Sequence, residues 1–389
     1  MRSLRGARDS KSFKNLMKNQ SNTNIQESFL QLVRLGIGTS KDAKIPKEID
    51  WMQMKAFADR QGLSAVVLDG IDIQNTNLSN STNTLPLQMK LEWIGEVLQN
   101  YEQRYVQYEN AIGSLAGFYN SHGFKMMVLK GYACSLDWPK PKHRPCGDID
   151  IWQFGQQKEA DAALTAWFKS SKVQEFKVDA SHHHHTVFEW QGFTVENHYD
   201  FVNVYQHKSH KELEAVFKEL GQDDGYYVDI DGSRVYLPSP NLHALFLIKH
   251  ILLHFVSGEM TFRQLLDWSF FVRAHHGEID WAWLSEHMER FGMKQMFNII
   301  NAICVGELGF DVTLFPTVQF EPGLKDRILR DMFQPEFSEK IPNGVVSRFI
   351  WRYRHWKANE WKHDLCFTDS MWSSFWSGVW GHLLKPSSI

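Results

Sequence analysis

The N-terminal part of the chain shows the spacing of apolar residues that is typical of helices. Apolar side chains recur at three- and four-residue intervals over residues 27–35 and 51–61, which predicts two short helices. Residues 75–83 are nearly all Asn, Ser and Thr, so we expect a linker there. A long helix is predicted over 86–121, where the helical spacing resumes and ends before a glycine. Residues 25–123 are therefore predicted to form an N-terminal helical region.

The pattern changes over residues 124–239, where short apolar runs of strand length replace most of the helical spacing. The predicted strands are 124–129, 149–154, 182–190, 193–202, 226–230 and 235–237, and one helix is predicted over 158–169. The last four strands form two pairs, each joined through a glycine-containing turn, which predicts two β-hairpins. The fold class expected for this core is α+β, with a mixed β-sheet and flanking helices.

Helical spacing returns from residue 240 onwards and predicts an α-helical C-terminal domain over residues 240–389. Its predicted helices are 242–256, 262–274, 281–291 and 295–308. Close to the end, tryptophans and other apolar residues keep helical spacing along one stripe between Phe367 and Leu384. We expect this stripe to pack on the body of the protein, with binding to a membrane surface or a partner as the alternative.

Composition and charge narrow the class of protein. The chain has 389 residues, enough for two compact units, and its hydrophobic share of 43% and charged share of 22% are those of a globular protein. A formal net charge of -3 argues against general nucleic-acid binding, which requires an excess of Lys and Arg. The four cysteines form no CxxC pair, which favours a reducing compartment over a disulfide framework or structural zinc.

The first residues of the chain are polar and basic. Residues 1–24 have too few apolar side chains to fold by themselves, so we expect a disordered tail. No apolar run follows their charges, and no stretch of membrane-spanning length is found elsewhere. The sequence therefore predicts a cytoplasmic protein without a transmembrane segment.

Two aspartates on one predicted strand are the first candidates for chemistry. Asp148 and Asp150 are two residues apart, so their side chains point to the same face of the strand while the adjacent isoleucines point to the other. Carboxylates side by side repel each other unless a cation lies between them, and Mg²⁺ is the cation that such oxygen-rich sites hold. Glu196 and His198 share a face of a neighbouring predicted strand, and Glu196 is the candidate for a third carboxylate.

A glycine turn precedes this pair of acids. The predicted strand 124–129 is followed by Lys130 and Gly131 and then by a short helical segment. Such a turn presents backbone N–H groups and an ammonium to a triphosphate, and glycine allows the phosphate to approach the backbone closely.

These segments resemble the nucleotidyltransferase superfamily of the DNA polymerase beta type, and within it an uncharacterised bacterial family with the pattern LKG…R…GDIDI…VExH. The resemblance extends from about residue 25 to residue 273. The matching residues are Leu129-Lys130-Gly131, Arg144, Gly147-Asp148-Ile149-Asp150-Ile151 and Val195-Glu196-Asn197-His198.

The resemblance implies an enzyme that transfers a nucleoside monophosphate from an NTP to an acceptor by two-metal catalysis with Mg²⁺, or Mn²⁺ in its place, and releases pyrophosphate. Asp148, Asp150 and Glu196 would be the catalytic residues and the metal ligands, and Glu196 would help to activate the acceptor hydroxyl. The predicted nucleotide-binding residues are Lys130, Gly131, Arg144 and His198. In one departure from the superfamily, Tyr132 follows Gly131 where Gly or Ser is usual. The acceptor is not indicated: a small molecule, a protein side chain and an RNA end all remain open.

The insert between the glycine turn and the aspartates is basic. Residues 138–144 contain Lys140, Lys142, His143 and Arg144, whose positive charge is suited to a triphosphate. Arg144 is the residue that we expect to make this contact.

Histidines form a second group of candidates. His182 to His185 are consecutive, and on a strand no more than two of them share a face, so we expect either a role at the site or a partly solvated strand. His250 and His254 share a face of a predicted helix, and Arg263 and Asp267 lie on the next one. His250 and Arg263 are candidates for acceptor binding, with a structural contact between helices as the alternative.

Two other classes of function remain open from the sequence. A noncatalytic nucleotide-sensing or partner-binding protein would explain the missing Gly-Ser turn. A metal-dependent phosphohydrolase would explain the many histidines. A His-Asp pair on a helix would support it, but the sequence contains only His363-Asp364, in a region whose pattern predicts little.

Overall fold

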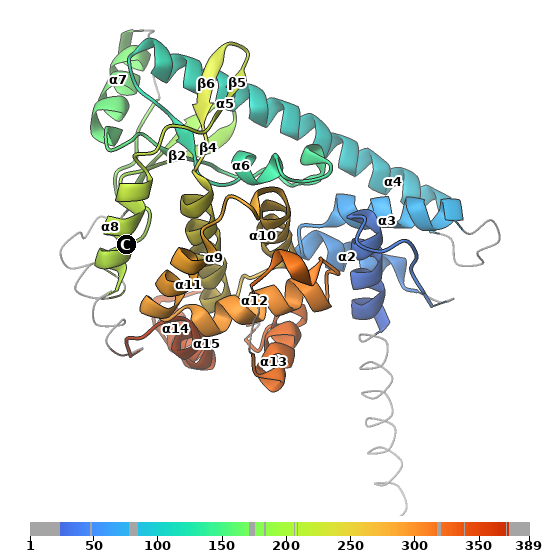
Figure 1. The fold of residues 1–389 in the computed structure, drawn as a ribbon. Coiled ribbons are helices and arrows are strands. Elements are labelled where there is room, and N and C mark those ends of the chain that lie inside the picture. The colour runs from blue at the N-terminus through green and yellow to red at the C-terminus, as the bar shows by residue number, and fades with distance from the viewer. Residues whose placement is uncertain are drawn as a thin grey trace, which may run out of the picture.

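The computed structural model describes residues 24–46, 49–77, 85–170, 176–182, 184–205, 207, 209–316, 320–337, 339–370 and 372. Within these residues a mixed sheet lies between a long helix on one side and a layer of C-terminal helices on the other (Figure 1). The predictions of a mixed sheet with flanking helices and of a helical C-terminal region are confirmed. None of the described helices is long and apolar enough to cross a bilayer.

Six strands form one sheet in the order β3-β4-β2-β1-β6-β5. They are β1 (Met127–Val128), β2 (Ile149–Trp152), β3 (His185–Trp190), β4 (Phe193–His198), β5 (Tyr227–Ile230) and β6 (Ser233–Tyr236). The pairs β3–β4 and β5–β6 are antiparallel and are the two predicted hairpins. β2 runs parallel to β4 and antiparallel to β1, and β1 runs parallel to β6, which makes the sheet mixed.

Each face of the sheet belongs to a different hydrophobic cluster. Ile149, Ile151 and Val195 lie in the cluster formed with α5 (Arg104–Ser121) and α7 (Gln157–Ser170). Residues of the opposite face join the cluster of the C-terminal helices, as Trp152 does. Because side chains alternate along a strand, Asp150, Glu196 and His198 point toward the C-terminal helices.

The long helix predicted over 86–121 is present as three consecutive helical segments. α4 (Leu87–Val97) passes into a π-helical turn, η1 (Leu98–Gln103), and then into α5, and together they extend along one side of the molecule (Figure 1). The helix predicted over 27–35 spans residues 24–36, and α2 (Trp51–Arg60) is the other predicted short helix.

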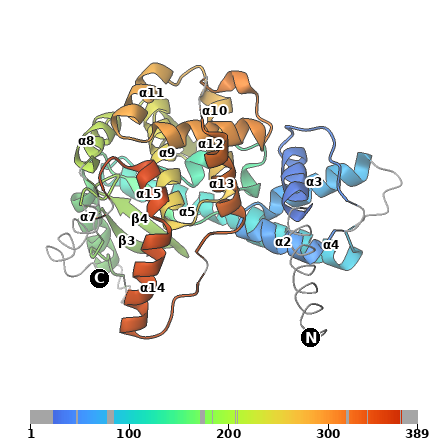
Figure 2. The same cartoon turned by 90° about the horizontal axis from the view of Figure 1, so that it is seen from below.

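The helix α3 (Ser64–Asn77) was not predicted. Its end covers the start of the linker expected over 75–83, and residues 78–84 of that linker lie outside the described residues. Viewed from below, α2, α3 and α4 stand together beside the C-terminal helices (Figure 2). Gln61 joins the two groups, because its side-chain amide donates to the carbonyl oxygen of Met332 and accepts from the backbone N–H of Phe262.

The four C-terminal helices predicted from the sequence are confirmed as α9 (Pro240–Ser257), α10 (Phe262–His275), α11 (Trp281–Arg290) and α12 (Lys294–Gly306). Further helices that were not predicted are α8 (His210–Leu220), α13 (Pro322–Phe333), α14 (Val345–Ala358) and α15 (Glu360–Cys366), with short turns η2 (Pro141–His143) and η3 (Val312–Leu314). The apolar stripe expected from Phe367 onwards lies mostly outside the described residues, but Phe367 itself is buried in the main hydrophobic cluster.

Candidate active site

The parallel pairing of β2 with β4 sets the carboxylates of the site side by side. Asp150 is the direct partner of Glu196 in the ladder, and His198 follows two residues later on the same face. Asp150, Glu196 and His198 each offer one ligand atom, and these atoms lie within 4.8 Å of one another. Asp148 immediately precedes β2 and is an exposed residue.

Asp150 is only 2% exposed and is held by two cationic partners. Its Oδ1 lies 2.9 Å from Nζ of Lys130 and 3.2 Å from Nε2 of His198. Burial favours the neutral acid, but these partners outweigh it and lower the pKa of Asp150. For His198, burial favours the neutral ring and so lowers its pKa. The hydrogen bonds of His198 to Asp150 and Glu196 outweigh this effect and raise its pKa to about 9.

Asp148 has the opposite electrostatic environment. Burial raises the pKa of its carboxyl, and the negative charges of Glu196 and Asp150 raise it further. The three carboxylates therefore interact with one another, and Asp148 lacks the close cations that Asp150 has. An additional cation at Asp148 and Glu196 would relieve this repulsion, so the donor set fits a divalent metal ion bound through oxygen.

Gly131 lies in the turn before α6 (Tyr132–Ser135) and requires its lack of a side chain. Its φ is +60°, and a Cβ atom would come within 2.4 Å of the Tyr108 hydroxyl oxygen. That hydroxyl donates to the carbonyl oxygen of Asp148 at 2.8 Å, so one contact joins the glycine turn to the acids. Tyr132 is buried, and its hydroxyl donates to Glu109 at 2.8 Å. Tyr132 thus fills a structural position.

The basic insert pairs with acids of the surrounding helices. Lys140 lies 2.6 Å from Asp69 of α3, and His143 lies 2.7 Å from Asp69 and 3.2 Å from Glu102 of η1. The positive charge that the sequence suggested for a triphosphate is therefore largely neutralised within the protein. These contacts fix the insert to the N-terminal helices.

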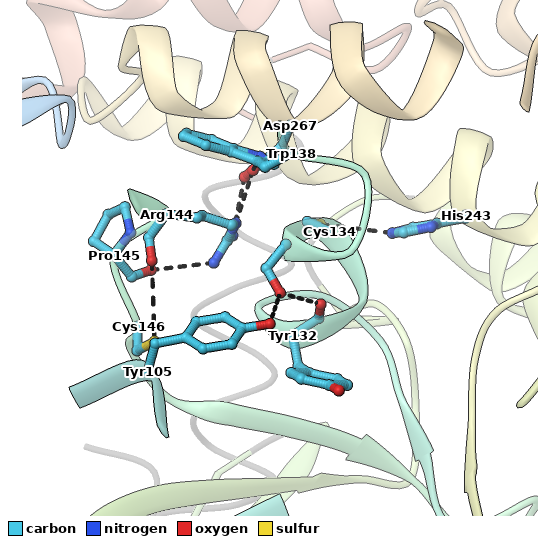
Figure 3. A network of polar contacts seen from close by, with 10 residues as sticks. Tyr105, Tyr132, Cys134, Trp138, Arg144, Pro145, Cys146, His243 and Asp267 are labelled. Atoms are coloured by element: carbon cyan, nitrogen blue, oxygen red, sulfur yellow. Dashed lines mark hydrogen bonds and ion pairs between the residues drawn. The ribbon is translucent and has the colours of Figure 1, made fainter. Parts of the chain in front are cut away.

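Arg144 also pairs with an acid of the protein, Asp267 of α10 (Figure 3). Its Nε and one terminal nitrogen donate to the two carboxylate oxygens of Asp267 at 2.8 and 3.0 Å, and Trp138 donates to the same carboxylate at 2.9 Å. Arg144 is 5% exposed, and although burial lowers its pKa, attraction to Asp267 raises it overall. The expected contact of Arg144 with a triphosphate stays a prediction, and it would have to share the guanidinium with Asp267.

A cavity of about 190 Å³ connects the glycine turn and the acids to the C-terminal helices. The predicted residues His250 and Arg263 line it together with His254, while Lys130 and the aspartates line the opposite wall. The complete lining is Lys130, Gly131, Cys134, Arg144, Gly147, Asp148, Asp150, Leu247, His250, His254, Arg263, Gln264 and Asp267. Larger hollows of 310, 440 and 590 Å³ lie elsewhere on the described surface, but none of them includes the acids.

The helical wall of the cavity is weakly charged except at Arg263. Burial lowers the pKa of His250 well below its usual value and that of His254 to about 4, and Lys130 adds to both shifts, so both rings are neutral. The two rings approach each other at 3.1 Å between their Nε2 atoms. Arg263 forms no ion pair with the residues that the structure describes, and burial and the neighbouring Arg144 lower its pKa.

Comparison with known protein families identifies the family of this chain. A model of the family described as "Uncharacterised nucleotidyltransferase" matches residues 47–305, which is more than half of the chain and contains the whole cavity lining. The chain belongs to this nucleotidyltransferase family. The resemblance found in the sequence is thereby confirmed. Comparisons with curated proteins and with solved structures return no match.

Two residues of the candidate site, Tyr108 and Gln264, were not predicted from the sequence. Tyr108 is part of the aromatic core pattern of a long helix, where nothing distinguishes it from its neighbours. Gln264 lines the cavity and also caps α10 through the backbone N–H of Thr261, a pattern that indicates only a helix start.

Two histidines of the run, His184 and His185, lie next to the acids. His184 and His185 flank His198, and burial followed by the charge of His198 lowers the pKa of each to about 3. Both rings are therefore neutral. His183 lies outside the described residues.

Proposed function

We propose that this protein transfers a nucleoside monophosphate from an NTP to an acceptor and releases pyrophosphate. The proposal rests on two observations: Asp150 and Glu196 are partners on one face of the sheet, and Asp148 and Asp150 line a cavity that also contains the glycine turn. Family membership supports the reaction class. The acceptor stays open between a small molecule, a protein and an RNA end.

Asp148, Asp150 and Glu196 are the residues that would hold Mg²⁺, with Mn²⁺ as a substitute. The ion would neutralise charge on the reacting phosphate and position the attacking and leaving oxygens. Glu196 is the side chain proposed to accept the proton of the acceptor hydroxyl, since its side chain is 24% exposed whereas Asp150 is enclosed.

Two cations of the cavity are proposed to bind the remaining phosphates. Lys130 lies two residues after the end of β1 and lines the cavity together with Asp148 and Asp150. Arg263 projects from the first turn of α10 on the opposite wall and has no carboxylate partner among the described residues. A guanidinium without a partner in a largely buried position is favourable for an anionic ligand. We therefore extend the proposed role of Arg263 from the acceptor to the triphosphate.

The proposal is tested by incubating the purified protein with each labelled NTP, Mg²⁺ or Mn²⁺ and a cell extract, and by identifying the fraction that becomes labelled. Asp148→Asn is the matched inactive variant. It removes a repelling charge, whereas Asp150→Asn would leave Lys130 and His198 without their buried partner. We expect label transfer by the wild-type protein and none by Asp148→Asn at unchanged thermal stability. Equal transfer by the variant would exclude Asp148 as a metal ligand.

The phosphate contact is tested separately by direct titration with a nonhydrolysable NTP. Arg263→Met should weaken binding by about 10- to 100-fold, because a charge-assisted contact from a buried site contributes about 1.5–3 kcal/mol. Arg273→Met is the control, since Arg273 lies on the same helix but is exposed and outside the cavity. Equal affinities of the two variants would remove Arg263 from the nucleotide site.

The same experiments distinguish the other two functions. NTP binding without label transfer to any fraction would indicate a nucleotide sensor on this fold. Release of phosphate without a labelled acceptor would indicate a phosphohydrolase, but His363 and Asp364 of α15 do not line the cavity.

A further inference from the structure

The histidines beside the acids form a cluster with the composition of a transition-metal site. His185 on β3 is the direct ladder partner of His198 on β4, and His184 immediately precedes β3. The ring centroids lie 4.3 Å apart for His184 and His185, 5.5 Å for His184 and His198, and 5.2 Å for His185 and His198. One nitrogen from each ring can be chosen so that all three lie within 4.8 Å of one another.

Two nitrogen atoms of this cluster form no hydrogen bond with the described residues. The Nδ1 atoms of His184 and His185 are buried, and neither has a hydrogen-bond partner among the described residues. The whole of His185 is only 6% exposed. Buried polar atoms in native proteins nearly always have a partner, so two orphaned imidazole nitrogens on adjacent residues call for a ligand that is absent from the polypeptide.

The nature of the donors indicates which ligand this is. Three neutral imidazoles suit Zn²⁺ and other first-row transition ions, whereas Mg²⁺ prefers oxygen ligands. The imidazolium of His198 beside Asp150 would release its proton to solvent when it binds the ion. We propose that His184, His185 and His198 bind one first-row divalent ion, with Zn²⁺ as the reference case, at a site that adjoins the carboxylate site for Mg²⁺. Three protein ligands leave a coordination position for water or a substrate oxygen. The metal site does not depend on the nucleotidyl transfer proposed above.

The two sites adjoin, which gives the histidine site a place in the cavity's chemistry. His198 contacts Asp150 at 3.2 Å and Glu196 at 3.7 Å, and Nε2 of His185 lies 3.9 Å from Glu196. Carboxylates at this distance orient metal-bound imidazoles and increase their affinity for the ion. The protein is therefore expected to bind Zn²⁺ in the absence of any nucleotide.

The test is a titration of the full-length, chelator-treated protein with ZnCl₂ by calorimetry, and with Co²⁺ by visible absorption. We expect one Zn²⁺ per chain, and at least a 100-fold loss of affinity in His184→Ala/His185→Ala. His122→Ala is the control, since His122 is exposed at the end of α5 and should bind as the wild type does. Asp148→Asn should also retain Zn²⁺, because Asp148 is outside the histidine set.

Two results would overturn the proposal: no Zn²⁺ binding by the wild-type protein, or equal affinity of the double variant and the wild type. If the double variant does not fold, the single variant His184→Gln, at the less buried ring, replaces it with the same two outcomes. Zn²⁺ binding without label transfer would reject the nucleotidyltransferase activity alone, and label transfer without Zn²⁺ binding would reject this site alone.

Discussion

The alternation of residues along a strand predicts which face a charged side chain occupies, but it does not predict the ion-pair partner of that side chain. The spacing of Asp148 and Asp150 predicts that their side chains share a face; in the structure Asp148 immediately precedes β2, and both residues line the cavity. The spacing gives no information on Lys130, whose ammonium neutralises Asp150 from the end of another strand. Nor does it reveal that Arg144 is held by Asp267, more than one hundred residues away in the sequence. Pairing of this kind depends on the tertiary fold.

Glu214 is a buried carboxyl whose titration should be measurable. It lies on α8, is 4% exposed, and accepts the backbone N–H groups of Phe201 and Val202 at 3.1 and 2.9 Å. Burial outweighs these hydrogen bonds and raises the pKa of Glu214 from 4.5 to about 7. Folding thus favours the protonated form, so its contribution to stability is complete below pH 4.5 and is lost as the pH rises through 7.

We predict that Glu214→Gln removes this dependence, since the amide oxygen accepts the same N–H groups without a charge. Relative to the wild type, the variant should gain up to about 3 kcal/mol of unfolding free energy between pH 5 and pH 8. Urea unfolding of both proteins across this range measures the difference and cancels the titration of other groups. A difference that stays constant with pH would show that Glu214 is ionised throughout.

Among the helices and strands, the sequence predicted those in which apolar residues recur along one buried face. The β3–β4 hairpin, the long helix over 86–121 and α9 to α12 all belong to this class. α3 was missed because residues 63–68 are buried consecutively, so its apolar side chains have no polar face to alternate with. α8 carries apolar residues at helical spacing, at Leu213, Val216, Phe217 and Leu220, so its sequence does indicate a helix.

The N-terminal helices contain a contact that depends on glycine. Gly70 of α3 approaches the helix formed by residues 24–36 so closely that a Cβ atom would lie 2.1 Å from the carbonyl oxygen of Leu32. From the other helix, a Cβ on Gly36 would lie 2.2 Å from the carbonyl oxygen of Val66. Backbone atoms cannot yield as a flexible side chain does, so these two helices owe their separation to the two glycines.

Gly70→Ala should therefore destabilise the protein by about 1–3 kcal/mol, the usual effect of overpacking. Gly95→Ala is the matched control: Gly95 is also helical, but it is exposed on α4 and a Cβ there meets no atom within 4 Å. The control should gain about 0.5–1 kcal/mol, because alanine has the better helix propensity. Chemical denaturation compares the two. Similar effects of both substitutions would show that the helices can separate at little cost.

For the whole molecule, the position of the cavity follows from the layered arrangement of the fold. The sheet supplies the acids on its inner face, the C-terminal helices supply Arg263 and the histidines, and the insert after the glycine turn joins the layers. The existence of an acidic site was predictable from residue types and spacing. The sequence left two roles for His250 and Arg263, acceptor binding and a structural contact between helices. Only the packing of α9 and α10 on the sheet places these two residues beside the acids.

The ion pair of Arg144 with Asp267 connects the insert to α10. Removing this ion pair tests whether it holds the insert and the C-terminal helices together. Asp267→Leu leaves a buried guanidinium and the indole N–H of Trp138 without their acceptor, so we expect a loss of about 3–5 kcal/mol. Arg144→Met/Asp267→Leu should lose less than the single variant, because the second substitution removes the uncompensated charge. Both the single and the double variant should weaken NTP binding, since the ion pair no longer holds the two walls of the cavity together. Chemical denaturation gives the stabilities and titration with a nonhydrolysable NTP gives the affinities; an Asp267→Leu protein as stable as the wild type would mean that other contacts hold the layers together.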